Sequence, residues 1–275
     1  MKNRKVSKEK IIFDLGSLGL KKGDVIFIAA DLFHIGYFNK SREQTYKDWV
    51  EILTTCVGEE GTIILPSYTD TFFRFNKNKN VVFDVNGGVS NSGSLTNAFL
   101  AFTNYKRSSH PTSSCIAIGK YADYILQGHS HDAPSYLPYQ RIIDLKGKNL
   151  MLGAFTERKL APMAMHAAQE RLGYTKKHWM SGFYQTYYVD KTGKMNLFTR
   201  MDPGGCTAGA HKLFGELIIE GAINFGYVGN SLSALLDASK SLFVFENSMK
   251  FNPELLRCHN RFCNSCYGTR LYNPR

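Results

Sequence analysis

The sequence predicts an α/β protein in which helices flank a central mixed β-sheet. Three apolar runs, Val25–Ala30, Thr62–Pro66 and 150–154, are continuous, as is typical of strands that are buried on both faces of a sheet. Segments with apolar residues at helical spacing lie between them. Between 180 and 198 the pattern changes to alternating aromatic residues, which indicates antiparallel strands and hence a sheet of mixed direction.

In the first half of the chain, glycine-containing turns separate predicted helices from predicted strands. Each helix carries an apolar residue every three or four positions. In order, we expect a helix over 8–20, a strand at Val25–Ala30, a helix over 46–57, a strand at Thr62–Pro66 and a capped helix over 92–100. The polar, glycine-rich stretch 76–91 is long enough to be a lid or a specificity loop.

The second half continues the alternation and adds a hairpin that turns at 190–193. Pro134 and Pro138 bound a segment that we expect to be irregular. The predicted elements are a strand over 115–118, helices over 120–127 and 160–171, hairpin strands over 180–189 and 195–198, helices over 210–219 and 231–241, and a short strand over 242–245.

Length and composition are those of a globular protein that buries a large core. The chain has 275 residues, of which 43% are hydrophobic and 21% charged, so disorder is excluded. There is no internal repeat and no clear boundary. We therefore expect a single domain over 1–250, followed by a cysteine-rich segment over 251–275. The oligomeric state stays open.

The net charge of +11 predicts attraction to anions such as phosphates, although a basic surface alone would also explain it. No run of basic residues occurs away from the termini, so nucleic acid is not specifically favoured. No apolar run is long enough to span a bilayer, and we expect no membrane partner. The basic start is not followed by an apolar segment of signal-peptide type, which predicts a cytoplasmic protein.

The loop 107–114 concentrates groups that can bind phosphate. It combines one guanidinium, one imidazole, five hydroxyl groups and a proline just ahead of a predicted strand. Arg107 can bind a phosphate with two parallel hydrogen bonds, and the hydroxyls of Ser108 and Ser114 can donate to phosphate oxygens. His110 belongs to the same loop. The alternative is a polar turn whose side chains cap neighbouring backbone groups.

Polar residues also follow two predicted strands at the end where open α/β sheets bind ligands. Asp31, Leu32 and Phe33 come after the first strand, and Tyr68 and Asp70 after the second. Asp70 is a candidate for holding a cationic group of a substrate. It is equally suited to capping a turn.

His166 is the candidate base. It lies on the predicted helix that opens directly after the strand 150–154, and Glu170 follows one helical turn later on the same face. A carboxylate at that distance can orient the imidazole or stabilise its charged form. Lone histidines on helices are more often structural, but a histidine on a helix that begins directly after a strand end is a better candidate for a base.

The segment around Cys258, Cys263 and Cys266 resembles a metal-binding knuckle, because two of these residues form a Cys-x-x-Cys pair. Cys258 or His259 is a candidate third ligand and Cys206 a fourth, which would make a structural zinc site. The alternative is a loose tail of free thiols, since six cysteines in a cytoplasmic chain are not expected to form disulfides.

Taken together, the motifs resemble the antibiotic N-acetyltransferases, the aminoglycoside 3-N-acetyltransferase family. They occur in the order of that family from about residue 10 to about residue 245, and Arg-Ser-x-His-Pro-x-x-Ser is the most specific of them. The matching stretches are 18–24, 61–66, 92–96, 107–114, 150–153, the helix of His166, and 226–230.

The resemblance implies an aminoglycoside 3-N-acetyltransferase-like fold with acetyl-CoA as donor and an amino-sugar nitrogen as acceptor. It implies that the loops at 31–36 and 107–114 embrace the coenzyme, and that His166 is the general base of a direct transfer without metal. Two differences stand out. Ala29-Ala30-Asp31 replaces the His-Ser-Ser of the family, and Gln169 replaces the glutamate of His-x-x-Glu, which leaves Glu170 as its substitute.

The acceptor has two candidate classes. Aminoglycosides are polycations, which a basic protein repels unless its cleft is locally acidic, whereas a nucleotide-linked amino sugar suits the charge of +11. The alternative from another class of function is a non-catalytic binding or regulatory protein on the same scaffold, with zinc bound by the cysteine cluster.

Overall fold

The computed structural model describes residues 5–87, 89–153, 155, 162–174, 181–200, 206–252, 254–263 and 266. Some expected positions lie outside these ranges, namely residue 154 of a strand, 160–161 of a helix, 180 of the hairpin, and 253, 264–265 and 267–275 of the cysteine-rich segment.

In the described part of the chain, a seven-stranded mixed sheet forms the centre of the molecule, in the order β10-β11-β7-β1-β2-β6-β5. Its strands are β1 (Val25–Ala30), β2 (Thr62–Pro66), β5 (Lys106–Arg107), β6 (Cys115–Gly119), β7 (Lys148–Leu152), β10 (Ile223–Val228) and β11 (Ser231–Asp237). β1 is parallel to both of its neighbours, β2 and β7, and the pairs outside this trio are antiparallel. The predicted fold class is confirmed.

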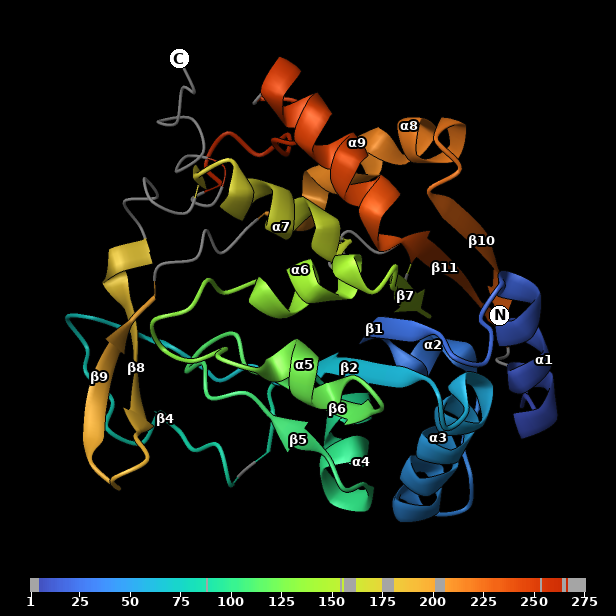
Figure 1. Ribbon diagram of the computed structural model, residues 1–275, viewed down its shortest axis with the longest axis horizontal. Coiled ribbons are helices and arrows are strands. Elements are labelled where there is room, and N and C mark those ends of the chain that lie inside the picture. Colours follow the sequence, from blue (N-terminus) through green and yellow to red (C-terminus); the bar gives the residue numbers. More distant parts are fainter. Residues whose placement is uncertain are drawn as a thin grey trace.

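Helices cover both faces of the sheet (Figure 1). One face carries α1 (Lys8–Leu18), α2 (Leu32–Ile35), α3 (Arg42–Val57) and α4 (Ser94–Phe102). The other carries α5 (Ala122–Leu126), α6 (Leu137–Asp144), α7 (Met163–Arg171), α8 (Phe214–Ile219), the 3-10 helix η3 (Thr207–Leu213) and α9 (Ala238–Phe251). Side chains of β1 alternate between the two layers, because Phe27 packs with α6 and α7 while Ile26 and Ile28 pack with α1 and α3.

The predicted hairpin forms, but outside the central sheet. β8 (Tyr184–Val189) and β9 (Met195–Thr199) are antiparallel and join the short strands β3 (Phe72–Phe73) and β4 (Val82–Phe83) in a second sheet. Figure 1 shows this small sheet beside the central one. The central sheet owes its mixed direction to β5, β6, β10 and β11 instead.

Three expected elements are wrong. The segment 231–241 is not one helix, because β11 runs to Asp237 and α9 begins at Ala238. The carboxylate of Asp237 caps this helix by accepting the amide hydrogen of Lys240 at 2.9 Å. The expected strand 242–245 therefore lies inside α9. α6 occupies part of the region expected to be irregular, with Pro138 in its first turn, where a proline costs no hydrogen bond.

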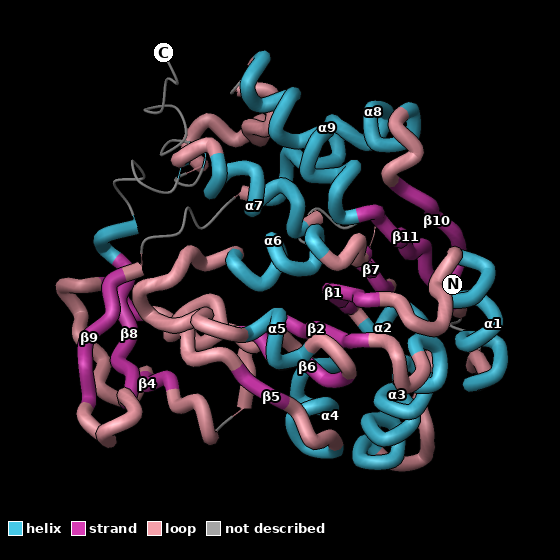
Figure 2. The backbone as a smooth tube through the Cα atoms, in the orientation of Figure 1, coloured by secondary structure: helices cyan, strands magenta, loops and turns pink. Residues whose placement is uncertain are grey.

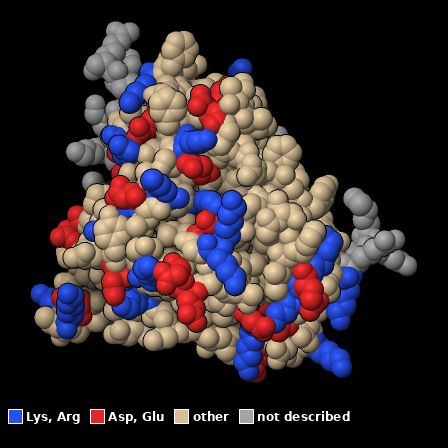
Figure 3. All heavy atoms as spheres, turned by 45° about the vertical axis from the view of Figure 1, so that its right-hand side comes forward, with Lys and Arg blue, Asp and Glu red and all other residues tan. Residues whose placement is uncertain are grey.

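None of the described helices combines the length and the hydropathy that crossing a membrane requires. On the face shown in Figure 3, basic side chains are interspersed with acidic ones. In the described part of the chain, ion pairs such as Lys8–Glu51 and Lys148–Asp24 place opposite charges side by side. The excess positive charge is thus not gathered into a single patch on that face.

Candidate active site

A cavity of about 580 Å³ opens at the carboxyl ends of β1 and β2. Its volume lies in the range of small-molecule sites, roughly 300–1,000 Å³. Loops lie between this end of β2 and the small sheet (Figure 2). The wall of the cavity includes Ala29, Ala30, Tyr68, Asp70, Thr112, Ser113, Tyr136, His166, Arg200 and Thr207.

His166 faces this cavity from the first half of α7. The helix begins after Pro162, and its alanines are buried against the core while His166 stays half-buried. The imidazole stacks on the ring of Tyr136, with 5.5 Å between ring centroids and 11° between planes. Its Nδ1 lies 3.2 Å from Oε1 of Gln169. Since an amide oxygen only accepts, this assignment puts the proton on Nδ1 and leaves the lone pair on Nε2.

Glu170 does not take the place that the sequence pattern predicts for it. Its carboxylate accepts the backbone amide hydrogens of Ser135, at 2.8 Å, and of Tyr136, at 3.1 Å. The side chain that pairs with the Nδ1 of His166 is Gln169. Glu170 therefore supports the loop that presents Tyr136 to the imidazole, which makes it a positioning residue.

Arg107 is held by the protein's own backbone. Its guanidinium donates to the carbonyl oxygens of Gly87, Asp84 and Ser67, at 2.8, 3.2 and 3.3 Å. It also lies over the ring of Phe83, 5.0 Å from the centroid. The sequence pattern predicts a phosphate contact for this group, whereas the structure places it on carbonyl groups that tie three loops together.

The other predicted phosphate ligands of this loop are buried inside it. Ser108, His110 and Ser114 are 3%, 1% and 0% exposed. The hydroxyl of Ser114 donates to the carbonyl of Ser108 at 2.8 Å, and the hydroxyl of Ser108 accepts the amide hydrogen of Cys115 at 2.9 Å. The loop thus follows the alternative interpretation, a polar turn that caps its own backbone.

His110 shapes the part of the loop that reaches the cavity. Its Nδ1 accepts the amide hydrogens of Ser113, at 3.0 Å, and Thr112, at 3.4 Å. The other nitrogen, Nε2, then carries the hydrogen and lies 3.4 Å from the hydroxyl of Ser135. Thr112 and Ser113 line the cavity. Sequence reasoning missed these two, because neither spacing nor residue type tells which hydroxyls of such a loop face outward.

His129 lies beneath His110 and is not a candidate base. The two rings stack at 4.8 Å, and Nδ1 of His129 lies 2.9 Å from the hydroxyl of Ser108. Burial, and then the neighbouring His110, lowers the pKa of His129 to about 3. The ring is therefore neutral near pH 7 and acts as a core residue under the loop.

The residues after β1 contribute less directly than expected. Asp31 caps α2 by accepting the amide hydrogen of Phe33 at 3.1 Å, and its other oxygen lies 3.1 Å from Nδ1 of His34. Leu32 is buried, while Phe33 is 67% exposed. In this region, Ala29 and Ala30 line the cavity.

Tyr68 and Asp70 line the cavity, as the sequence pattern predicts for a substrate site. Asp70 is exposed at the wall, and Arg200, which follows β9, lines the same cavity. Sequence reasoning missed Arg200 because nothing in the pattern of the hairpin places its end against the central sheet. The described lining therefore carries one acidic and one basic side chain besides His166.

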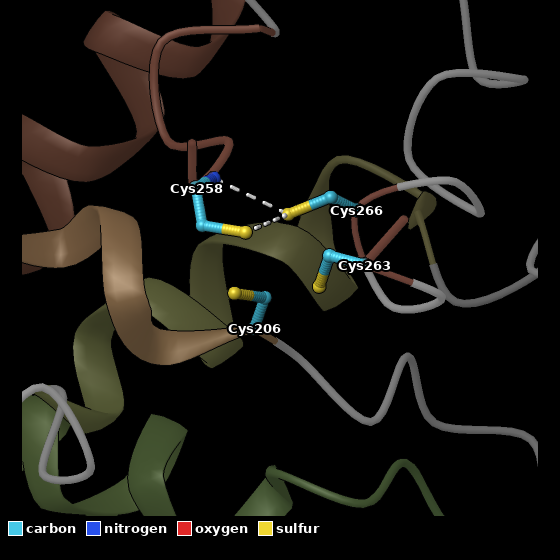
Figure 4. Close-up of side chains that lie close together, drawn as sticks. All are labelled: Cys206, Cys258, Cys263 and Cys266. Carbon is cyan, nitrogen blue, oxygen red and sulfur yellow. Dashed lines mark hydrogen bonds between the residues drawn. The ribbon is translucent and has the colours of Figure 1, made fainter. Parts of the chain in front are cut away.

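Four cysteines meet at the end of η3. The sulfur atoms of Cys206, Cys258, Cys263 and Cys266 all lie within 4.8 Å of one another, and Figure 4 shows the four side chains gathered around one space. The predicted fourth member, Cys206, is therefore brought to the other three. His259, the alternative ligand, is not part of this group.

The chain matches the family model described as aminoglycoside 3-N-acetyltransferase over residues 28–250. A prophage-derived aminoglycoside N(3')-acetyltransferase-like protein, YokD, of Bacillus subtilis (strain 168) is 25% identical over 62% of this chain and 67% of its own length. Aminoglycoside N(3)-acetyltransferase III of a Salmonella species is 28% identical over 61% of both chains. The chain thus spans about three fifths of the length of that relative.

Solved structures of aminoglycoside acetyltransferases share the fold. The apoenzyme of AAC(3)-IVa superposes with a TM-score of 0.76 at 18% identity and covers 98% of both chains. A binary complex of AAC-IIIb with CoASH gives a TM-score of 0.72 at 20% identity, over 90% of this chain and 97% of that one. The predicted resemblance is confirmed, and the chain belongs to the aminoglycoside 3-N-acetyltransferase family.

Proposed function

We propose that the protein transfers the acetyl group of acetyl-CoA to an amino group of an amino sugar, with His166 as general base. The observation that carries this proposal is the placement of His166 in the wall of a cavity at the strand ends, with its Nδ1 fixed by Gln169. Family membership and the names of the relatives, which are N-acetyltransferases, support the reaction class.

The reaction needs a base because an amine attacks a thioester only when it is neutral. In the proposed step, the amine nitrogen attacks the thioester carbonyl while Nε2 of His166 takes the proton of the nitrogen. The tetrahedral intermediate then expels the coenzyme A thiolate, which the imidazolium reprotonates. The products are the amide and free coenzyme A, and no acyl-enzyme forms.

The oxyanion of this intermediate requires a hydrogen-bond donor near the cavity. The backbone amides of Thr112 and Ser113 already donate to His110, so they are committed to the loop. The hydroxyl of Thr112 is buried and has no hydrogen-bond partner among the described residues. We assign it the donor role, because Thr112 lines the same cavity as His166.

The coenzyme is proposed to lie along the end of β1 and the loop 107–114, since both contribute to the cavity wall. A solved relative is named as a binary complex with CoASH. In this arrangement Phe33, which is exposed on α2 just after β1, is the side chain best placed to cover an apolar part of the coenzyme. Arg107 and Ser114 act by holding the loop.

For the acceptor we propose an aminoglycoside, with Asp70 as the counter-charge for one of its ammonium groups. Asp70 lies at the cavity wall, and a related acetyltransferase structure is named as a complex with a gentamicin. Arg200 in the same wall is the feature that favours a nucleotide-linked amino sugar as the alternative.

Release of free coenzyme A, measured with a thiol reagent on a panel of aminoglycosides and nucleotide-linked amino sugars, tests the proposal. Turnover on aminoglycosides with formation of the N-acetyl product is expected. Turnover restricted to nucleotide-linked amino sugars would show that the acceptor is not an aminoglycoside, while the acetyl-transfer reaction would stand. No turnover with any amine, together with bound metal, would favour the non-catalytic regulatory protein instead.

We also propose a reducing compartment, the cytoplasm, as the place of the reaction. The six cysteines are all free thiols in the structure, and four of them meet without forming a disulfide. Such an arrangement persists where thiols are kept reduced.

A further inference from the structure

We infer that Cys206, Cys258, Cys263 and Cys266 bind a zinc ion that fastens the C-terminal segment to the wall of the cavity. Metal binding is independent of catalysis, whereas the effect on the cavity rests on the proposed function.

The four sulfur atoms have the spacing of a tetrahedral thiolate site. All lie within 4.8 Å of one another, and Sγ of Cys266 is 3.6 Å from Sγ of Cys258. A tetrahedron with zinc–sulfur bonds of about 2.3 Å has sulfur–sulfur edges of about 3.8 Å. A disulfide needs about 2.05 Å, so the observed spacing is that of ligands around a common ion.

The backbone supports the same interpretation. The amide nitrogen of Cys258 donates to Sγ of Cys266 at 3.3 Å, and Figure 4 shows this contact within the cluster. Hydrogen bonds of this kind lower the negative charge on a ligand sulfur and fix its orientation, as partners of metal ligands do. Four sulfur ligands with no open position favour a structural zinc site over a catalytic one.

Two further contacts dock the C-terminal segment onto η3. The ammonium group of Lys212 donates to the carbonyl oxygens of Leu255, at 3.0 Å, and Arg257, at 2.6 Å. A Cβ placed on Gly209 would lie 1.8 Å from the carbonyl oxygen of Leu256, so the two backbones approach as closely as only glycine allows. Leu256 itself is 7% exposed and belongs to the core.

The metal site therefore lies one residue along the chain from the wall of the cavity. Cys206 is followed directly by Thr207, which lines the cavity together with His166. The described ligands come from two segments, one before η3 and one after α9. A zinc ion bound by ligands from both segments would fix the position of Thr207 and restrict the motion of the backbone in this part of the wall.

The test begins with the full-length protein, purified under reducing conditions and analysed by inductively coupled plasma mass spectrometry. We expect one zinc ion per chain. Cys206→Ser and Cys263→Ser should each lose the metal, while the matched control Cys56→Ser should keep it, because Cys56 lies on α3 and outside the cluster. Replacing zinc by cobalt should give the visible absorption of tetrahedral thiolate coordination.

Two results would overturn the metal assignment without any variant. One is wild-type protein that holds no metal while all its thiols react freely. The other is an intact mass, measured without reductant, that shows two disulfides in place of four thiols. Both apply even if a serine variant fails to fold.

The effect on the wall is tested separately by hydrogen exchange. Removing the metal with a chelator should speed exchange of the amides of η3 (Thr207–Leu213) and leave those of α3 unchanged. Unchanged exchange in η3 would refute the fastening role. Since neither readout uses acetyl transfer, a protein that acetylates no amine would contradict the proposed function and leave the metal site standing.

Discussion

The amide oxygen of Gln169 lies 3.2 Å from Nδ1 of His166, one helical turn away on α7. This contact fixes which nitrogen of the imidazole carries the hydrogen, but it does so with a neutral group. A carboxylate in this place would in addition stabilise the imidazolium that forms when His166 takes a proton.

Replacing His166 by alanine should lower kcat by about 10²–10⁴-fold and leave coenzyme binding intact, because the imidazole removes a proton but does not hold the donor. Steady-state kinetics and calorimetric titration with coenzyme A measure the two effects. His131→Ala is the matched control, since that exposed ring stacks on Tyr188 and does not line the cavity. Near-normal turnover of the His166 variant would remove the residue from the mechanism.

Replacing Gln169 by glutamate should move the acidic limb of the pH–rate profile to higher pH. A carboxylate beside Nδ1 favours the protonated imidazole, so a higher pH is needed to obtain the neutral base. Gln169→Met, which keeps the size but accepts no comparable hydrogen bond, should lower kcat without that displacement. An unchanged acidic limb in the glutamate variant would show that the titrating group is not His166.

Replacing Arg107 by lysine should destabilise the fold by about 2 kcal/mol, because one ammonium group cannot serve three carbonyl oxygens in different directions. Urea unfolding measures the change, with Lys106→Ala as control for a neighbouring exposed cation. Coenzyme affinity should stay within about threefold of the wild type if Arg107 only holds the loop. A variant with normal stability and a large loss of coenzyme affinity would instead indicate that Arg107 contacts a phosphate of the coenzyme.

Stability should fall on acidification through His129. Its pKa is about 3 in the folded protein and about 6.5 in the unfolded chain. The unfolded state therefore binds more protons between these values, and stability present above pH 6.5 is lost as pH falls toward 3. At pH 5 the loss amounts to about 2 kcal/mol. His129→Asn, which can still pair with Ser108, should flatten the decline between pH 7 and 5 in thermal unfolding; equal slopes would contradict this role.

Replacing Asp70 by asparagine should raise KM for a polycationic aminoglycoside by about three- to tenfold and change kcat little, because the carboxylate attracts the substrate without joining the chemistry. Added salt should reduce the difference between variant and wild type. Asp132→Asn, an exposed carboxylate that does not line the cavity, controls for the change in net charge. If KM rises equally in both variants, Asp70 has no local role.

The buried parts of the fold were predictable because burial on both faces demands continuous apolar runs. β1 and β2 begin and end where the runs Val25–Ala30 and Thr62–Pro66 do. The error at 231–241 has the opposite cause. Its short apolar stretch fits either period, and pairing with β10 and β7 makes β11 a strand, through tertiary contacts that local pattern does not encode.

The site was predictable in outline for a similar reason. The position of His166 after a strand end places it at the edge where ligands bind, and the loop 107–114 does reach the cavity. Which side chains of that loop face inward was not predictable, because Ser108 and Ser114 differ from Thr112 only in the partners that folding gives them. Arg200 and the role of Glu170 likewise depend on contacts between distant segments.

The pairing of β1 with β7 has a consequence for biosynthesis. β1, β2, β5 and β6 leave the ribosome well before Lys148–Leu152, so one edge of β1 stays open on the nascent chain until β7 arrives. That edge presents unpaired backbone N–H and C=O groups, which can pair with another chain until β7 covers them. His166, Arg200 and Thr207 line the cavity and follow β7 in the chain, so a growing polypeptide completes the described cavity wall only after β7 has been made.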